Sequence, residues 1–384
     1  QQAMVAEHGS QCGFCTPGIV MALYALWMET HAPDAAQIEV ALQGNLCRCT
    51  GYAPIIRAAH SAARTGTPAA DRLMQERDRV SAALDALDDG ARVVTGPEAD
   101  RAVLPANVDD FAEVLADSPH ATIVAGATDV ALWVTKFLRP IGPAIFIGHL
   151  DGLRRIEVDE TDIRVGAGVS YSGLAPVIAD HYPGLKEYWS RIAGWQVRNA
   201  GTIGGNIANG SPIGDTPPAL IALGASITLR HRSARRSLPL EAFFVDYGKQ
   251  DRAPGEFVEE ICIPRLAPDQ IVAAYKLSKR RDEDISSVAV GISVTRHKGR
   301  ITACRIAYGG MAATPKRAAR AEAALTGQPW GQAAFEAAMA MLPHDFTPLT
   351  DMRASAAYRM RAAQNLLMRF YLEHEQGAAA RLSA

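Results

Sequence analysis

The stretch Gln11-Cys12-Gly13-Phe14-Cys15-Thr16-Pro17-Gly18 is followed further along the chain by Asn45-Leu46-Cys47-Arg48-Cys49-Thr50-Gly51-Tyr52. The spacing is C-x2-C-x31-C-x-C, so four of the six cysteines form two tight pairs within the first 50 residues. Two close pairs separated by about one helical hairpin can bring four sulfurs to one point, as a zinc ion or an iron–sulfur cluster requires. The chain therefore begins with a predicted metal-binding domain.

Helices are expected beside both cysteine pairs. Thr16 is a good N-cap and Pro17 a good first residue for a helix reaching Met28, which is apolar almost all round and is therefore expected to be buried. Further helices are expected at 33–42 and 55–63. Both cysteine pairs are followed by Thr, Pro and a helix, so the two pairs are expected to face one another.

The second pair favours iron over zinc. Structural zinc sites usually space both pairs as C-x2-4-C, whereas Cys47 and Cys49 are separated by a single residue. A two-iron cluster takes two thiolates on each iron, and nearby helix N-termini stabilise anionic sulfur. Zinc, or buried cysteines without metal, remain the alternatives. Cys262 and Cys304 stand alone in apolar, strand-like surroundings and are interpreted as small core residues.

Composition limits the remaining possibilities. A length of 384 residues predicts several domains, and 48% hydrophobic residues suffices for their cores. Lys+Arg 39 against Asp+Glu 41 gives no electrostatic case for nucleic acid or an anionic membrane, and the basic cluster at 231–236 is interpreted as a solvated hairpin end. No apolar run is long enough to cross a membrane, and neither a signal peptide nor a secreted disulfide framework is recognisable. A cytoplasmic location is predicted.

A linker is expected at about 66–92, where an amphipathic helix at 71–87 partly folds on its neighbour. After a helix at 107–115 comes a buried strand at 121–125, the turn Gly126-Ala127-Thr128-Asp129, and a helix at 130–138. Such a turn points successive amide N–H groups at one place, which suits pyrophosphate. It is neither G-x-G-x-x-G nor a Walker loop, so a plain strand–helix turn is the alternative.

A second glycine-rich segment, at 199–215, holds too many Gly and Asn residues for a regular element. It would let a ligand approach the backbone closely, with Asn206, Ser211 and Asp215 available for hydrogen bonds; a long surface loop is the alternative. One large cofactor contacted by both segments is the economical interpretation. Strands are expected beyond it at 271–279, 287–295 and 301–308, then helices at 315–325, 331–341 and 352–374.

The strings CGFCTPG and NLCRCTGY resemble the helical [2Fe-2S] domain of the xanthine dehydrogenase and aldehyde oxidase family, the molybdenum hydroxylases. The resemblance implies Cys12, Cys15, Cys47 and Cys49 as cluster ligands, and places Gln11 near the molybdopterin of a partner subunit. In that family a plant-ferredoxin-like domain with its own cluster comes first. Because residue 1 is not Met, that domain and a second [2Fe-2S] cluster are expected upstream of this numbering.

The strings VAGATD and TIGGNIANGSPIGD resemble the flavin domain of the same family, which is of the vanillyl-alcohol-oxidase type and not a Rossmann fold. The resemblance implies FAD, and it implies that Tyr247 borders the NAD site and that the loop at 281–284 shapes access to the flavin. From the residue alone, Lys276 reads as a solvated strand-end lysine. The FAD contacts that the resemblance implies are Ile123, Val124, Ala125, Gly126, Ala127, Thr128, Asp129, Ile192, Thr202, Ile203, Gly204, Gly205, Asn206, Asp215, Val258 and Lys276.

The expected architecture is multidomain α+β. It consists of a helical [2Fe-2S] domain (1–65), a linker (66–92), a vanillyl-alcohol-oxidase-type FAD-binding domain (93–265) and a C-terminal α+β cap domain (266–384).

The resemblance implies the small subunit of a bacterial two-chain xanthine dehydrogenase. Such a chain passes electrons from a molybdenum-binding large subunit through clusters to FAD and then NAD, as hypoxanthine and xanthine are oxidised to urate. No residue of this subunit is expected to be catalytic in purine hydroxylation. A heterotetramer of two small and two large subunits is expected. The same role in an aldehyde or N-heterocycle oxidoreductase is the alternative, and a zinc-binding scaffold without flavin is a distant one.

Overall fold

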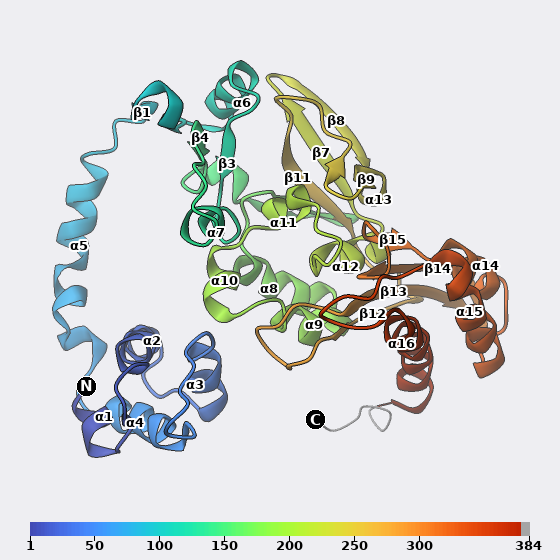
Figure 1. Ribbon diagram of the computed structural model, residues 1–384, viewed down its shortest axis with the longest axis horizontal. Coiled ribbons are helices and arrows are strands. Elements are labelled where there is room, and N and C mark those ends of the chain that lie inside the picture. The colour runs from blue at the N-terminus through green and yellow to red at the C-terminus, as the bar shows by residue number, and fades with distance from the viewer. Residues whose placement is uncertain (378–384) are drawn as a thin grey trace. The chain divides into compact units, whose positions relative to one another are not determined.

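The computed structural model describes residues 1–377, which fall into two compact units. The first unit comprises residues 1–91 together with Gly194–Gln196, and the second comprises Arg92–Ala193 and the chain from Val197 onward. Helices make up the regular structure of residues 1–91, and the second unit contains both strands and helices (Figure 1). This is the multidomain α+β architecture expected from the sequence.

The first unit is built from short helices around a small core. Ile19, Ile38 and Ile55, from three successive helices, are fully buried at its centre. Asp34 begins the third helix with a capping box, in which its side chain and that of Gln37 each bond the other's backbone N–H. The helices are α1 (Gln2–Ala6), α2 (Thr16–Glu29), α3 (Ala35–Ala41), α4 (Ala53–Ala63) and α5 (Arg72–Asp85), with a 3-10 turn at Pro68–Ala70.

Two helices of this unit are more exposed than the sequence predicts. In α2 only Ile19 is buried, and Met21 is 63% exposed, so the prediction of a buried helix is wrong. The small core covers only one side of this helix. The hydroxyl of Tyr24 donates to Asp71 at 2.8 Å and ties down the start of α5. The rest of α5 contains no buried residue.

The second unit begins with a four-stranded sheet in the order β1-β2-β4-β3, in which β2, β4 and β3 run parallel. Helix α6 (Val108–Asp117) is capped by Asn107 and packs Phe111 against Phe257, with ring centroids 4.4 Å apart. The strand, turn and helix predicted near residue 125 are confirmed as β3 and α7 (Val130–Thr135). The strands are β1 (Val93–Thr95), β2 (Ala102–Leu104), β3 (Thr122–Val124) and β4 (Ala144–Phe146), with a 3-10 turn at Glu98–Asp100.

A five-stranded antiparallel sheet follows, in the order β5-β6-β11-β7-β8. Its core includes Tyr182 and Trp189, which are almost fully buried. Its strands are β5 (Ile156–Val158), β6 (Asp162–Gly166), β7 (Ser226–His231), β8 (Ala234–Pro239) and β11 (Phe257–Pro264), and β9 (Phe244–Asp246) pairs with β10 (Lys249–Gln250). The helices are α8 (Tyr171–His181), α9 (Lys186–Ser190), α10 (Trp195–Ala200), α11 (Ile203–Asn209), α12 (Thr216–Leu223) and α13 (Leu240–Phe243), with 3-10 turns at Asp151–Leu153 and Pro183–Leu185.

The C-terminal part contains a four-stranded antiparallel sheet in the order β12-β13-β14-β15. Helices α14, α15 and α16 pack beside it, in the orange to red part of Figure 1, around a core that includes Phe335 and Phe370. The predicted strands and helices are confirmed, with shifted ends: β12 (Gln270–Leu277), β13 (Val288–His297), β14 (Arg300–Gly309), α14 (Ala319–Leu325), α15 (Gln332–Asp345) and α16 (Ala356–Gln376). The short strand β15 (Lys316–Arg317) was not predicted and replaces the start of the helix expected at 315–325. Within residues 1–377, no helix has both the length and the apolar character that crossing a membrane requires.

Candidate cofactor-binding sites

The four N-terminal cysteines meet as two pairs, each with one member from each stretch. The thiol of Cys12 lies close enough to that of Cys49, and the thiol of Cys15 to that of Cys47, for each to shift the pKa of its partner. We call the exposed pair Cys12/Cys49 the outer pair, and Cys15/Cys47, whose Cys47 is buried, the inner pair. Among residues 1–377 no group of three or more His, Cys, Asp or Glu side chains is arranged to hold a metal ion.

The pairing fits a two-iron cluster better than a single zinc ion. Each iron of a [2Fe-2S] cluster takes two protein thiolates, so the outer and inner pairs can supply one iron each. A structural zinc ion instead requires four ligands in a tetrahedron around one point. The four cysteines remain the predicted ligands, with the two thiolates of each iron drawn from different stretches of the chain.

Close packing brings the two stretches together. An added Cβ at Gly18 would come within 2.7 Å of the Asn45 Oδ1 atom, so α2 can approach the second stretch because glycine stands there. Gly51 and Tyr52 both have positive φ, which turns the chain from the second cysteine pair into α4. The Tyr52 hydroxyl accepts a hydrogen bond from the Cys47 N–H at 2.9 Å and fixes the buried cysteine.

The inner pair contains one thiol that ionises easily and one that does not. The Thr50 hydroxyl lies 3.1 Å from the Cys47 sulfur and lowers the pKa of Cys47 to about 7. Burial raises the pKa of Cys15. Metal binding requires both as thiolates, so loading of the cluster would release the proton that the pair retains.

A cavity of about 450 Å³ lies in the second unit, in the size range of cofactor sites. Its walls come from the end of β3 and the turn after it, from α11 and from β11. The two glycine-rich segments therefore border a single cavity. The predicted FAD residues in its lining are Ile123, Ala125, Gly126, Ala127, Thr128, Asp129, Thr202, Gly204, Gly205, Asn206 and Val258.

Two glycines permit close backbone packing at this cavity. An added Cβ at Gly126 would overlap the carbonyl oxygen of Ala200, and one at Gly204 would overlap the side chain of Ala167. Neither glycine has a positive φ, so the need is for room and not for an unusual backbone conformation. Any larger residue at either position would push the walls of the cavity apart.

The turn after β3 presents backbone donors. Ala127 has a φ of 58°, a left-handed conformation that is uncommon for a residue with a side chain. No described residue accepts a hydrogen bond from the amide N–H of Ala127, Thr128 or Asp129. Backbone donors without protein partners beside a cavity suit an anionic ligand, and pyrophosphate is such a ligand.

The second glycine-rich segment is partly helical, so the prediction that it contains no regular element is wrong. Residues Ile203–Asn209 form α11, whose N-cap Thr202 accepts a hydrogen bond from the Gly205 N–H at 3.1 Å. The Gly204 N–H donates to the Ala167 carbonyl at 2.9 Å. Capping and tertiary packing outweigh the low helix propensity of Gly and Asn. Because these N–H groups are already hydrogen-bonded within the protein, α11 contributes only wall and side chains to the cavity. The turn after β3 contributes the backbone donors.

Asp215 and Lys276 meet in a buried cluster outside the cavity lining. The Lys276 Nζ atom lies 2.6 Å from Asp215 Oδ2, and the Ser286 hydroxyl donates to Oδ1 at 2.5 Å. The Lys276 side chain is 1% exposed, so the interpretation of a solvated lysine is wrong. The cluster adjoins the cavity through Thr216, which donates to the lining residue Asn206.

The other predicted residues lie away from the cavity lining. Val124, Ile192 and Ile203 are buried in the core. Tyr247 is 73% exposed, in the hairpin between β9 and β10. Gln11 is exposed beside the outer cysteine pair.

Several lining residues were not predicted from the sequence: His120, Trp133, Tyr171 and Arg252. Trp133 has a recognisable signal, since it lies one helical turn beyond Asp129 and so on the same side of α7. The others reach the cavity by tertiary packing of distant segments. Burial chiefly, and the Asp215 carboxylate to a lesser degree, raise the pKa of Tyr171, so its hydroxyl stays neutral.

Replacing Gly204 with alanine is expected to lower the free energy of unfolding by about 1–3 kcal/mol, because the new methyl group is forced against Ala167. FAD affinity should fall as well, since the overlap moves a wall of the cavity. Thermal unfolding and flavin titration measure the two effects. Gly173→Ala is the matched control, because a Cβ at this exposed position in α8 meets only side-chain atoms at 3.3 Å or more. Equal stability of the two variants would contradict the packing argument.

Each part of the chain matches a described protein family. Residues 1–60 match a [2Fe-2S] binding domain, residues 98–266 match the FAD binding domain in molybdopterin dehydrogenase, and residues 273–374 match the CO dehydrogenase flavoprotein C-terminal domain. The thiol pairs lie in the first match and the cavity in the second, so [2Fe-2S] and FAD domains are both present in this chain.

Curated relatives are much longer than this chain. Xanthine dehydrogenase of Emericella nidulans is 27% identical over 97% of this chain, which covers 31% of that protein. Xanthine dehydrogenase of Drosophila pseudoobscura pseudoobscura is 30% identical over 86% of this chain, which covers 28% of that protein. Nicotinate hydroxylase of Emericella nidulans is 28% identical over 97% of this chain, which covers 35% of it. The chain thus spans about a third of the length of these relatives.

Two solved structures match most of this chain over nearly the full length of their own chains. A chain of carbon monoxide dehydrogenase from Hydrogenophaga pseudoflava is 29% identical with a TM-score of 0.66, over 72% of this chain and 96% of that one. A chain of quinoline 2-oxidoreductase from Pseudomonas putida 86 is 25% identical with a TM-score of 0.64, over 72% and 96%. With its [2Fe-2S], FAD-binding and flavoprotein C-terminal domains, the chain belongs to the xanthine dehydrogenase and molybdenum hydroxylase family of oxidoreductases.

Proposed function

We propose that this chain passes electrons from a molybdenum centre on a partner subunit, through [2Fe-2S] clusters, to FAD and then to NAD. The observation that carries the proposal is the presence, on one polypeptide, of two thiol pairs suited to two irons and a cavity with free backbone donors. Family membership supports a redox use of both. The domain division 1–65, 66–92, 93–265 and 266–384 is part of this proposal.

The side chains of this chain would hold and shield the cofactors without serving as acids or bases. The outer and inner cysteine pairs would hold one iron each. The amide N–H groups of the turn after β3 would bind the pyrophosphate of FAD, and Val258 would pack against an apolar part of it. When bound there, FAD would supply the chemistry that collects single electrons and transfers them in pairs to nicotinamide. Tyr247 is exposed and so accessible to NAD.

For the complete enzyme we propose oxidation of hypoxanthine and xanthine to urate, because xanthine dehydrogenases are among its relatives. The partner would be a molybdopterin-binding large subunit in a heterotetramer of two copies of each chain, with Gln11 near the molybdopterin and a second [2Fe-2S] cluster upstream. An N-heterocycle or aldehyde oxidoreductase is the second candidate, favoured by nicotinate hydroxylase and quinoline 2-oxidoreductase. The substrate site would lie on the partner, so comparing purine and N-heterocycle turnover by the assembled enzyme separates the two.

Anaerobic titration of the purified chain with NADH tests the electron-transfer proposal. We expect the visible absorption of flavin and of the iron–sulfur cluster to bleach, and Tyr247→Ala to raise the NADH concentration that this requires. Val245→Ala is the matched control, since Val245 is also exposed beside the same hairpin turn. A colourless protein containing stoichiometric zinc would contradict the redox function and support the scaffold alternative. Bleaching by dithionite but not by NADH would contradict NAD as acceptor.

A further inference from the structure

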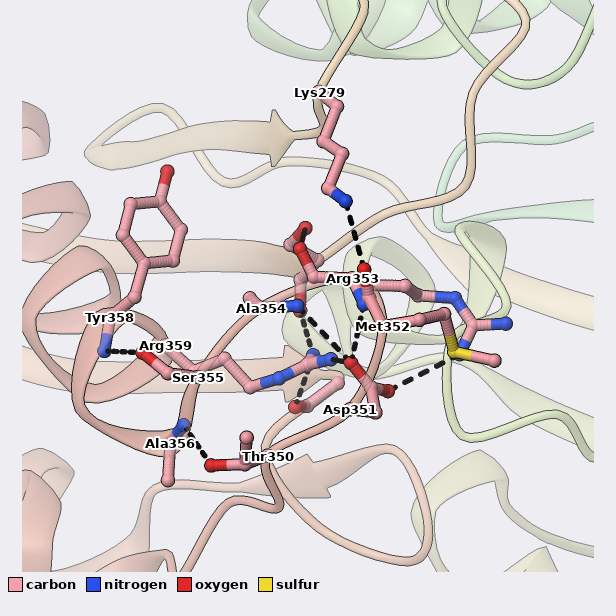
Figure 2. Close-up of polar contacts among 12 residues, drawn as sticks. Lys279, Thr350, Asp351, Met352, Arg353, Ala354, Ser355, Ala356, Tyr358 and Arg359 are labelled. Carbon is pink, nitrogen blue, oxygen red and sulfur yellow. Dashed lines mark hydrogen bonds and ion pairs between the residues drawn. The ribbon is translucent and has the colours of Figure 1, made fainter.

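Arg359, near the start of α16, is 2% exposed and bonds to three oxygens from different parts of the chain. Its Nη2 atom donates to Asp351 Oδ1 at 2.6 Å, and its Nη1 atom donates to the Gly310 carbonyl at 3.1 Å and to the Ser287 carbonyl. Figure 2 shows Arg359 extending from its helix to Asp351. A guanidinium with fixed acceptors in this geometry holds the segments that supply them in place.

Asp351 is an acceptor that is itself held in place by backbone hydrogen bonds. Its Oδ1 atom accepts hydrogen bonds from the backbone N–H groups of Arg353 at 2.8 Å and Ala354 at 3.1 Å (Figure 2). Burial acts to raise the pKa of Asp351, but these N–H groups and the Arg359 guanidinium hold it well below its usual value. The carboxylate therefore remains charged, and the Asp351–Arg359 pair stays intact at neutral pH.

Gly310 connects Arg359 by hydrogen bonds to one end of the loop before α12. The Gly310 N–H donates to the Pro212 carbonyl at 2.8 Å. Gly310 has a φ of 79°, and an added Cβ there would crowd the Ser287 carbonyl, so glycine is required for the contact. Arg359 therefore restrains Pro212 through one intervening residue.

Ser287 and its neighbour Ser286 connect Arg359 to the other end of the same loop. The neighbouring residue, Ser286, is 1% exposed and donates its hydroxyl to Asp215. Asp215 precedes Thr216, whose hydroxyl donates to the cavity residue Asn206. Arg359 is thus linked by hydrogen bonds to both ends of the segment 212–215, through Gly310 to Pro212 and through the Ser286–Ser287 backbone to Asp215. Asn206 is the residue of the cavity lining that this network contacts.

We infer that Arg359 is a positioning residue for the flavin site, acting from the C-terminal domain through Ser286 and Gly310. None of its hydrogen-bond partners belongs to the cavity lining, but it fixes the loop that carries Asp215 and, through Thr216, orients Asn206. The inference rests on the proposed binding of FAD in the cavity. It adds that the C-terminal domain, by way of α16, determines the geometry and affinity of a site built by the preceding domain.

The test is a double-mutant cycle on the full chain with Arg359→Lys and Ser286→Ala, measured as the dissociation constant of FAD by flavin fluorescence. Each single variant is expected to weaken binding about tenfold, the effect of one or two hydrogen bonds. The double variant should lose about tenfold and not about a hundredfold, because both act on the same loop. Both single variants should also change the visible circular dichroism of bound flavin in the same direction. Arg361→Gln, at an exposed position on the same helix, is the matched control and should bind as the unaltered chain does.

The outcomes separate the inference from the function on which it rests. An unaltered chain that does not bind FAD would contradict the proposed function itself. FAD binding that is normal in the unaltered chain and equally tight in Arg359→Lys would overturn the inference alone, as would a fully additive double variant. If Arg359→Lys does not fold, Ser286→Ala decides with Ser287→Ala as its control, and unchanged affinity in Ser286→Ala overturns the inference.

Discussion

Replacing Cys47 with serine is expected to remove the [2Fe-2S] cluster from the purified chain and to leave FAD bound. Cys47 is the buried member of the inner pair, and without it Cys15 has no partner for the iron that the two would share. A serine hydroxyl does not ionise near neutral pH and is a harder ligand than thiolate, so it does not substitute for sulfur. Iron and sulfide analysis, with paramagnetic resonance of the reduced protein, should show complete loss of the cluster.

FAD binding should survive because the thiol pairs and the cavity belong to separate compact units. Cys262→Ser is the matched control, since Cys262 lies in β11 and contacts no other cysteine. It should keep its full complement of iron. Full iron content in Cys47→Ser would contradict the ligand assignment, and loss of flavin together with iron would contradict the independence of the two sites.

The cysteine spacing carried most of the information about the first site, but not the pairing. The C-x-C spacing of Cys47 and Cys49 disfavoured zinc and so favoured a two-iron cluster. The helices expected after Thr16 and Pro54 are confirmed, with ends shifted by one or two residues. The pairing across stretches depends on the approach of α2 to Asn45, which Gly18 permits. Such contacts between distant segments leave no periodic signal in the sequence.

The sequence correctly predicts the turn at 126–129 beside the cavity, but it wrongly predicts that the segment after Gly201 contains no regular element. The Gly and Asn residues of this segment have low helix propensity, but the N-cap at Thr202 and packing against Ala167 stabilise a helix there. His120 and Arg252 reach the cavity only through tertiary packing, so no local pattern could indicate them. Exposure of α2 was also misjudged, because apolar composition predicts burial without saying what covers the helix.

The burial of Lys276 was likewise not predicted from the sequence. Replacing this residue is the second substitution for which we expect a large effect. Lys276→Met should lower the free energy of unfolding by about 3–5 kcal/mol, the cost of leaving one charge of a buried ion pair without its partner. Asp215 would keep only the Ser286 hydroxyl on its carboxylate, with a side chain 11% exposed and little access to water. Denaturant unfolding of the chain without FAD measures the change.

A second substitution, at Asp215, decides whether the stability lost in Lys276→Met comes from the unpaired charge or from lost packing. Adding Asp215→Asn to Lys276→Met removes the stranded charge and retains an acceptor for Ser286, so the double variant should regain much of the lost stability. Lys249→Met, at an exposed position in β10, is the matched control and should change stability by no more than about 0.5 kcal/mol. A double variant as unstable as Lys276→Met alone would mean that the lysine stem packs the core and that its charge is incidental. Recovery would instead show that the Lys276–Asp215 pair stabilises the fold by charge, with Asp215 also held by Ser286, whose neighbour Ser287 accepts a hydrogen bond from Arg359.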